Sequence, residues 1–101
     1  MLDDSLFPRV ICPRMRAIMV LFTHDGDLLD LLFHKDRQRL RLEPESLRIA
    51  AGTLSSGQRV LVEIALDLWD GVGEVHLWDL LGSLDGERFK VFIQALMILR
   101  Q

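Results

Sequence analysis

The stretch from Leu54 to Gly71, LSSGQRVLVEIALDLWDG, carries the sharpest folding signals of this chain. Ser55 and Gln58 have the spacing of a capping box, in which the serine oxygen accepts from a free helix amide and the glutamine reaches back. Gly71 suits the left-handed conformation that closes a helix. We therefore expect a helix from about residue 56 to 69. It should be largely buried, because its charged side chains fall four apart on one narrow stripe: Arg59, Glu63 and Asp67.

A second helix is expected from about residue 86 to 100, with Asp85 as its N-cap. Its inner stripe is predicted to be Phe89, Phe92, Ile93 and Leu96. Further apolar residues widen this surface beyond what one small core covers, which suggests a contact with another chain. We therefore expect a homodimer or a contact with another protein. The candidate interface residues are Phe92, Met97, Ile98 and Leu99.

The chain before residue 54 favours β-structure. RAIMVLFT at 16–23 indicates a buried strand, HDGD at 24–27 a hairpin turn, and RLRLE at 39–43 alternates with period 2. These patterns predict a small β-meander. Residues 27–34 fit a strand and a helical stripe equally well, so both assignments stay open there.

Length and composition complete the predicted architecture. The chain has 101 residues, enough for one core, and 50% of them are hydrophobic. We expect an α+β fold, a small single domain in which an N-terminal β-hairpin or meander packs on a C-terminal helical unit of two main helices. Residues 1–14, where Pro8 and Pro13 bracket RVIC, show no regular period and are expected to form a flexible arm. Residues 15–101 then form the globular domain.

Charge and cysteine content narrow the function classes. The net charge of -3 repels a polyanion on average, so nucleic-acid binding would need a concentrated basic face. Cys12 is the only cysteine, which fits a reducing compartment. The first residues are acidic, and the early apolar run at 17–22 is too short to span a bilayer. We therefore expect a cytoplasmic protein that has no contact with a membrane.

The sequence LSSGQ at 54–58 resembles the LSGGQ signature of the ABC-type ATPases. In that family the amides and the serine of the signature meet a nucleotide γ-phosphate at a helix start. The likeness continues into HLWDLLGSLDG at 76–86, where Asp79 would fall on the metal-ligating aspartate. The resemblance implies a candidate anion or nucleotide contact at Ser55, Ser56, Gly57 and Gln58.

The chain lacks the residues of that family on which nucleotide binding and hydrolysis depend. No glycine precedes a lysine, so the phosphate-binding loop G-x-x-x-x-G-K-[ST] is absent. Leu80 stands in place of the catalytic glutamate, and Ser56 replaces the first glycine of the signature. We therefore expect no ATP hydrolysis, and an ordinary helix cap explains the stretch without any cofactor.

A group of histidines and aspartates suggests metal binding or acid and base chemistry by residue type alone. If 24–27 is a turn, His34 lies on the order of 20 Å away along a strand, and still roughly 10 Å away along a helix. This spacing predicts a polar surface, without a metal site. The residues are His24, Asp25, Asp27, His34 and Asp36.

Two basic regions suggest other partners. The helices on either side of GSLDG at 82–86 resemble a helix-turn-helix, whose second helix would present Arg88 and Lys90 to DNA. Period 2 would also place three arginines on one strand face, able to meet an acidic partner. This candidate basic surface consists of Arg37, Arg39 and Arg41.

The function expected from the sequence is a non-catalytic protein–protein interaction or structural module that associates with itself. No group of residues demands enzymatic chemistry or a cofactor. Two alternatives stay open: a DNA-binding regulator of helix-turn-helix type, and a nucleotide-linked accessory protein with a signature-like helix start.

Overall fold

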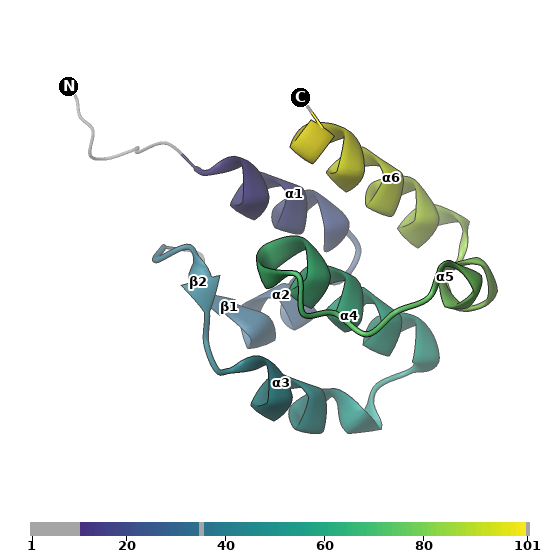
Figure 1. Cartoon of the computed structure of the whole chain (residues 1–101), viewed down its shortest axis with the longest axis horizontal. Coiled ribbons are helices and arrows are strands. Elements are labelled where there is room, and N and C mark those ends of the chain that lie inside the picture. The colour runs from purple at the N-terminus through teal and green to yellow at the C-terminus, as the bar shows by residue number, and fades with distance from the viewer. Residues whose placement is uncertain (1–10, 35, 101) are drawn as a thin grey trace.

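The computed structural model describes residues 11–34 and 36–100, and helices dominate this part of the chain (Figure 1). The predicted α+β fold is wrong, because the expected meander is replaced by helices and one very short strand pair. The α-helices are α1 (Pro13–Leu21), α2 (Gly26–Leu32), α3 (Pro44–Ala50), α4 (Ser56–Asp70), α5 (Leu77–Ser83) and α6 (Gly86–Arg100). The other elements are a 3₁₀ helix, η1 (Ala51–Thr53), and the antiparallel strands β1 (Phe33–His34) and β2 (Arg39–Leu40).

The run at 16–23, expected to be a strand, lies mostly in α1. Pro13 occupies the first turn, where its missing N–H is not needed, and the sulfur of Cys12 accepts from the Met15 amide at 3.4 Å. The buried residues Met15 and Ile18 repeat at helical spacing. The prediction failed because a short apolar run does not distinguish a strand from a buried helix. Of the expected arm, residues 1–10 lie outside the described residues.

The expected hairpin turn at 24–27 is the start of α2. Asp25 is its N-cap residue, and the Asp25 carbonyl accepts from the amides of Leu28 and Leu29. The side chain of Asp25 makes no cap, because it is engaged by Arg88 of α6. The backbone of Asp25 therefore starts a helix where a turn was expected, and its side chain binds a distant partner that the sequence does not indicate.

The strand pair is much shorter than the predicted meander. Of the open segment 27–34, the structure makes all but the last two residues helical. Phe33 then pairs with Leu40, and His34 with Arg39. The alternating pattern at 39–43 thus yields only two paired residues.

The two helices predicted for the C-terminal half are present with nearly the expected bounds. At the start of α4, Ser55 Oγ accepts from the Gln58 amide at 3.2 Å, and Gln58 Oε1 accepts from the Ser55 amide at 3.4 Å. Gly71 closes the helix with φ 71°. Asp85 Oδ1 accepts from the Arg88 amide at 2.9 Å at the start of α6. Local hydrogen bonds therefore define these helix ends.

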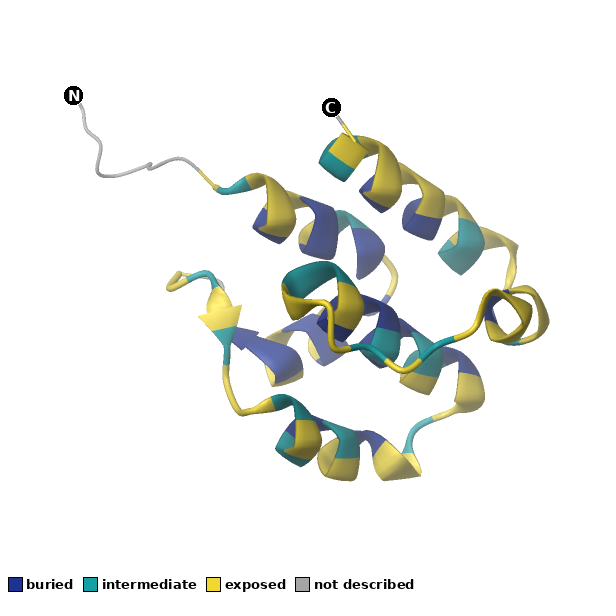
Figure 2. Ribbon diagram, viewed as in Figure 1, coloured by how far each residue is buried: buried dark blue, intermediate teal, exposed yellow. Residues whose placement is uncertain are grey.

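α4 lies at the centre of the molecule, in contact with α1 and α5. α1 lies alongside α6 and runs in the opposite direction (Figure 1). The faces that α1, α4 and α6 turn toward one another are buried (Figure 2). The largest fully buried side chains of the described residues include Phe22, Phe33, Met15, Ile18, Leu61 and Leu66.

The segment between α4 and α5 is fixed on α4 by close backbone packing. A Cβ on Gly73 would lie 2.1 Å from the Glu63 carbonyl oxygen, so only glycine fits. Glu63 Oε1 accepts from the Glu74 amide at 2.8 Å, and Arg48 of α3 donates to Glu63 Oε2 at 2.9 Å. Hydrogen bonding to Glu63 raises the pKa of Arg48, so this cation is permanent. The segment that leads into α5 is therefore held on α4 by these contacts.

Candidate interaction surfaces

α5 presents three large apolar side chains to solvent. Leu77 is 77% exposed, Trp78 81% and Leu81 65%, whereas Leu80 on the other side of the helix is buried. Positions 77, 78 and 81 fall on one face because residues three and four apart are neighbours on a helix. Figure 2 shows this helix exposed over most of its surface. We call Leu77, Trp78 and Leu81 the α5 face.

A second apolar surface lies on α6. Ile93, Leu96 and Met97 are exposed and line a shallow hollow together with Arg100. We call Ile93, Leu96 and Met97 the α6 stripe.

The predicted interface residues of α6 are divided between this stripe and the core. Met97 is 63% exposed, and Phe92 is buried with Val91 and Ala95 against the rest of the protein. Ile98 and Leu99 are partly buried against the same core. The helix is turned relative to the predicted inner stripe, because apolar residues occur around most of its circumference and spacing alone does not choose the buried side.

The signature-like residues serve as a helix cap. Ser55 and Ser56 are exposed, and Gly57 is buried against the end of α5, where a Cβ would lie 2.9 Å from the Ser83 carbonyl oxygen. A shallow groove beside this contact holds one arginine and three carboxylates, which does not favour a triphosphate. Its polar lining includes Ser56, Arg59, Glu63, Glu74, Asp79 and Ser83.

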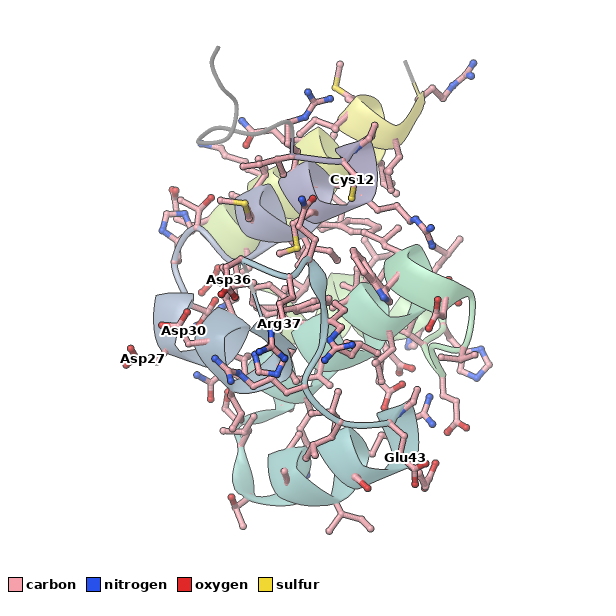
Figure 3. All side chains as sticks on the ribbon, turned by 90° about the vertical axis from the view of Figure 1, so that its left-hand side faces the viewer. Cys12, Asp27, Asp30, Asp36, Arg37 and Glu43 are labelled. Carbon is pink, nitrogen blue, oxygen red and sulfur yellow. The ribbon has the colours of Figure 1, made fainter. Side chains whose placement is uncertain are left out.

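The candidate basic surface lies on and beside the strand pair. Arg37 and Arg39 are exposed, and Arg41 Nε donates to the Asp30 carbonyl. Figure 3 looks onto this side of the molecule and shows Asp30 and Asp36 on the same side as Arg37. Desolvation and then the charge of Arg41 lower the pKa of His34, so its ring is neutral at pH 7. The carboxylates of Asp30 and Asp36 interrupt the positive surface, and His34 adds no positive charge to it.

The pair Asp25–Arg88 is a feature that the sequence did not reveal. Arg88 donates to both oxygens of Asp25, at 2.8 Å and 2.6 Å, and the Asp25 side chain is only 4% exposed. The hydrogen bond from Arg88 is the main reason that the pKa of Asp25 lies below its usual value. The position of Asp25 between two apolar runs was the only local signal. It does not indicate that its partner lies 63 residues away in the sequence.

This pair bears on two of the hypotheses from the sequence. The helix-turn-helix hypothesis requires the Arg88 side chain to be available to DNA. Its guanidinium is instead hydrogen-bonded to Asp25. His24 lies 3.7 Å from Glu87, which leaves that ring directed to α6. Within residues 11–34 and 36–100, no group of three His, Cys, Asp or Glu side chains is arranged to hold a metal ion.

Comparison with known proteins gives no relative. No protein-family model matches the chain, and neither a curated protein nor a solved structure is significantly similar to it. Among the helices described, none has the length and apolar character to cross a membrane.

Proposed function

We propose that this protein is a non-catalytic interaction module that associates with itself through the α6 stripe. The supporting observation is that Ile93, Leu96 and Met97 lie exposed in a row on a long helix that is anchored on its other side. Burying apolar surface against a second copy yields roughly 25 cal/mol per Å². Because the helix is already held by α1, little conformational entropy is lost on association.

Two copies of α6 would meet in an antiparallel contact about a two-fold axis. Glu87 lies in the first turn of α6 and Arg100 in its last. A two-fold axis through the middle of the α6 stripe places Arg100 of each copy opposite Lys90 of the other, with Glu87 about one turn beyond, so apolar burial and not charge pairing carries the association. The proposal includes a cytoplasmic location, which suits the free thiol of Cys12.

Light scattering at increasing protein concentration tests this proposal. The mass of the wild type is expected to rise from 11.6 kDa toward twice that value. Met97→Asp should remain monomeric, because a buried carboxylate in the contact is costly. Ile49→Asp on α3 is the control, since Ile49 is also exposed but lies outside the stripe. A wild type that stays monomeric at high concentration would refute the proposal, as would a dimer lost only in Ile49→Asp.

A further inference from the structure

The α5 face lies in the most acidic part of the chain. Between Arg59 and Arg88 there is no lysine or arginine, but there are seven acidic residues. The α6 stripe, in contrast, lies on a helix that carries Lys90 and ends at Arg100. The acidic residues of the α5 region are Glu63, Asp67, Asp70, Glu74, Asp79, Asp85 and Glu87.

Several of these carboxylates already have cationic partners within the chain, and two beside α5 remain accessible. Glu63 is held by Arg48, and Asp85 by Arg88. The Glu74 side chain is 77% exposed and lies 3.8 Å from Arg48, whose charge is shared with closer carboxylates. Asp79 is exposed and contacts the backbone amide of His76 through Oδ2 at 3.4 Å.

Glu74 and Asp79 line the groove between α4 and α5. Because Asp79 is an α5 residue itself, this groove borders the helix that carries the α5 face. Asp79 lies beyond the Trp78 edge of the α5 face and away from Leu77 and Leu81, so a long cationic side chain of a ligand that covered the face would reach the carboxylates past Trp78. Arg59 is the one cation in the groove lining, and it belongs to α4.

We infer that the α5 face docks a cationic amphipathic segment of a partner protein, with apolar side chains on Leu77, Trp78 and Leu81 and lysine or arginine toward Glu74 and Asp79. Three apolar anchors within about one and a half helical turns match the recognition of an amphipathic helix, whose own anchors repeat every three or four residues. An exposed tryptophan at the centre of such a contact is the typical energetic anchor. The small surface predicts weak, reversible binding.

The charges distinguish this partner from two other occupants. An anionic bilayer would be repelled by the same carboxylates that attract lysine and arginine. A second copy of this chain offers the strand-pair arginines, but Asp36 lies among them. The inference goes beyond self-association and involves different residues, so the two proposals fail separately.

Fluorescence of Trp78 gives a direct assay. The chain has two tryptophans, so Trp69→Phe leaves Trp78 as the only one. The probe is an amphipathic helical peptide of leucine and lysine, about four turns long, compared with its leucine and glutamate counterpart. We expect the lysine peptide to shift the Trp78 emission to shorter wavelength and to bind at least about tenfold more tightly than the glutamate peptide. High salt should weaken binding of the lysine peptide.

Matched variants locate the binding surface. Leu77→Ala should weaken binding of the lysine peptide about fivefold or more, whereas Ile49→Ala should not. The two residues are 77% and 78% exposed, so the comparison isolates position. Glu74→Gln with Asp79→Asn should reduce the salt dependence and keep the apolar contact, and asparagine preserves an acceptor for His76.

Any one of the following outcomes would overturn the inference. They are no emission shift with the lysine peptide, equal binding of both peptides, equal sensitivity to Leu77→Ala and Ile49→Ala, and a larger shift with anionic phosphatidylglycerol vesicles than with the peptide. Loss of peptide binding in Met97→Asp would also contradict it, because the site would then coincide with the α6 stripe. Circular dichroism of each variant confirms that the helices are retained.

Discussion

α1 and α5 are both short helices rich in apolar residues, and they use those residues in opposite ways. α1 buries Met15, Ile18 and Leu21 completely. α5 buries Leu80 and leaves its other large apolar side chains in water. Since apolar burial is the main stabilising contribution in folding, α1 is needed for the fold, whereas the α5 face is available to another molecule.

A pair of equivalent substitutions tests this contrast with the largest expected effect. Leu21→Ala in α1 should lower the free energy of unfolding by about 3.5 kcal/mol, because it leaves a cavity in the core. Leu81→Ala in α5 should change it by less than about 0.5 kcal/mol, because the side chain is already in water. Urea denaturation of both variants measures the difference. Equal losses would show that α5 contributes to the core as α1 does.

The Asp25–Arg88 pair joins the start of α2 to α6. Breaking this pair should have the next largest effect on the free energy of unfolding. Asp25→Asn leaves the Arg88 guanidinium without its carboxylate and should cost about 2.5 kcal/mol at pH 7, reduced from the fully buried case because Arg88 is partly exposed. Urea denaturation measures this loss. Asp27→Asn on the same helix is the control, since Asp27 is exposed.

The same pair predicts a pH dependence. The folded protein holds the pKa of Asp25 below 3.8, so its contribution is complete above about pH 4 to 5 and is lost as the pH falls through the lowered value. Asp25→Asn should remove this part of the acid sensitivity. If wild type and variant lose stability in parallel between neutral pH and about pH 3, the ion pair does not supply it.

The capping box at the start of α4 should give a smaller effect. Ser55→Ala removes the acceptor for the Gln58 amide and should cost about 1 kcal/mol, or about 4–8 °C in melting temperature. Millimolar ATP with magnesium should leave the melting temperature of wild type and variant unchanged. A rise in the wild type that Ser55→Ala abolishes would restore the nucleotide interpretation of this stretch.

The folding of α4 and α6 was predictable because their ends are set by neighbours in sequence. Ser55, Gln58 and Gly71 carry enough local information to start and end a helix. The segments before residue 54 lack such signals on both sides. Their secondary structure is decided by packing on α4 and α6. The spacing of apolar residues along the sequence carries no information about that packing.

The candidate surfaces were only partly predictable for a related reason. The excess of apolar residues on α6 suggested an apolar surface beyond the core, and Met97, one of the candidate interface residues, is exposed in the structure. Which side of α6 faces α1 depends on the whole core, so Phe92 was named both in the inner stripe and in the candidate interface, and Ile93 and Leu96 were placed inward although they are exposed. The exposure of Trp78 depends on how the 71–76 segment positions α5, which no local pattern reports.

The most direct test of the account is the stability of a variant without the α5 face. Leu77, Trp78 and Leu81 are replaced together by serine, and the free energy of unfolding is measured by urea denaturation at low protein concentration. We predict a change of less than about 1 kcal/mol with the helical circular dichroism retained, because these side chains are exposed in the folded chain. A loss of about 3 kcal/mol or more would mean that the α5 face belongs to the core and is not a surface kept for a partner.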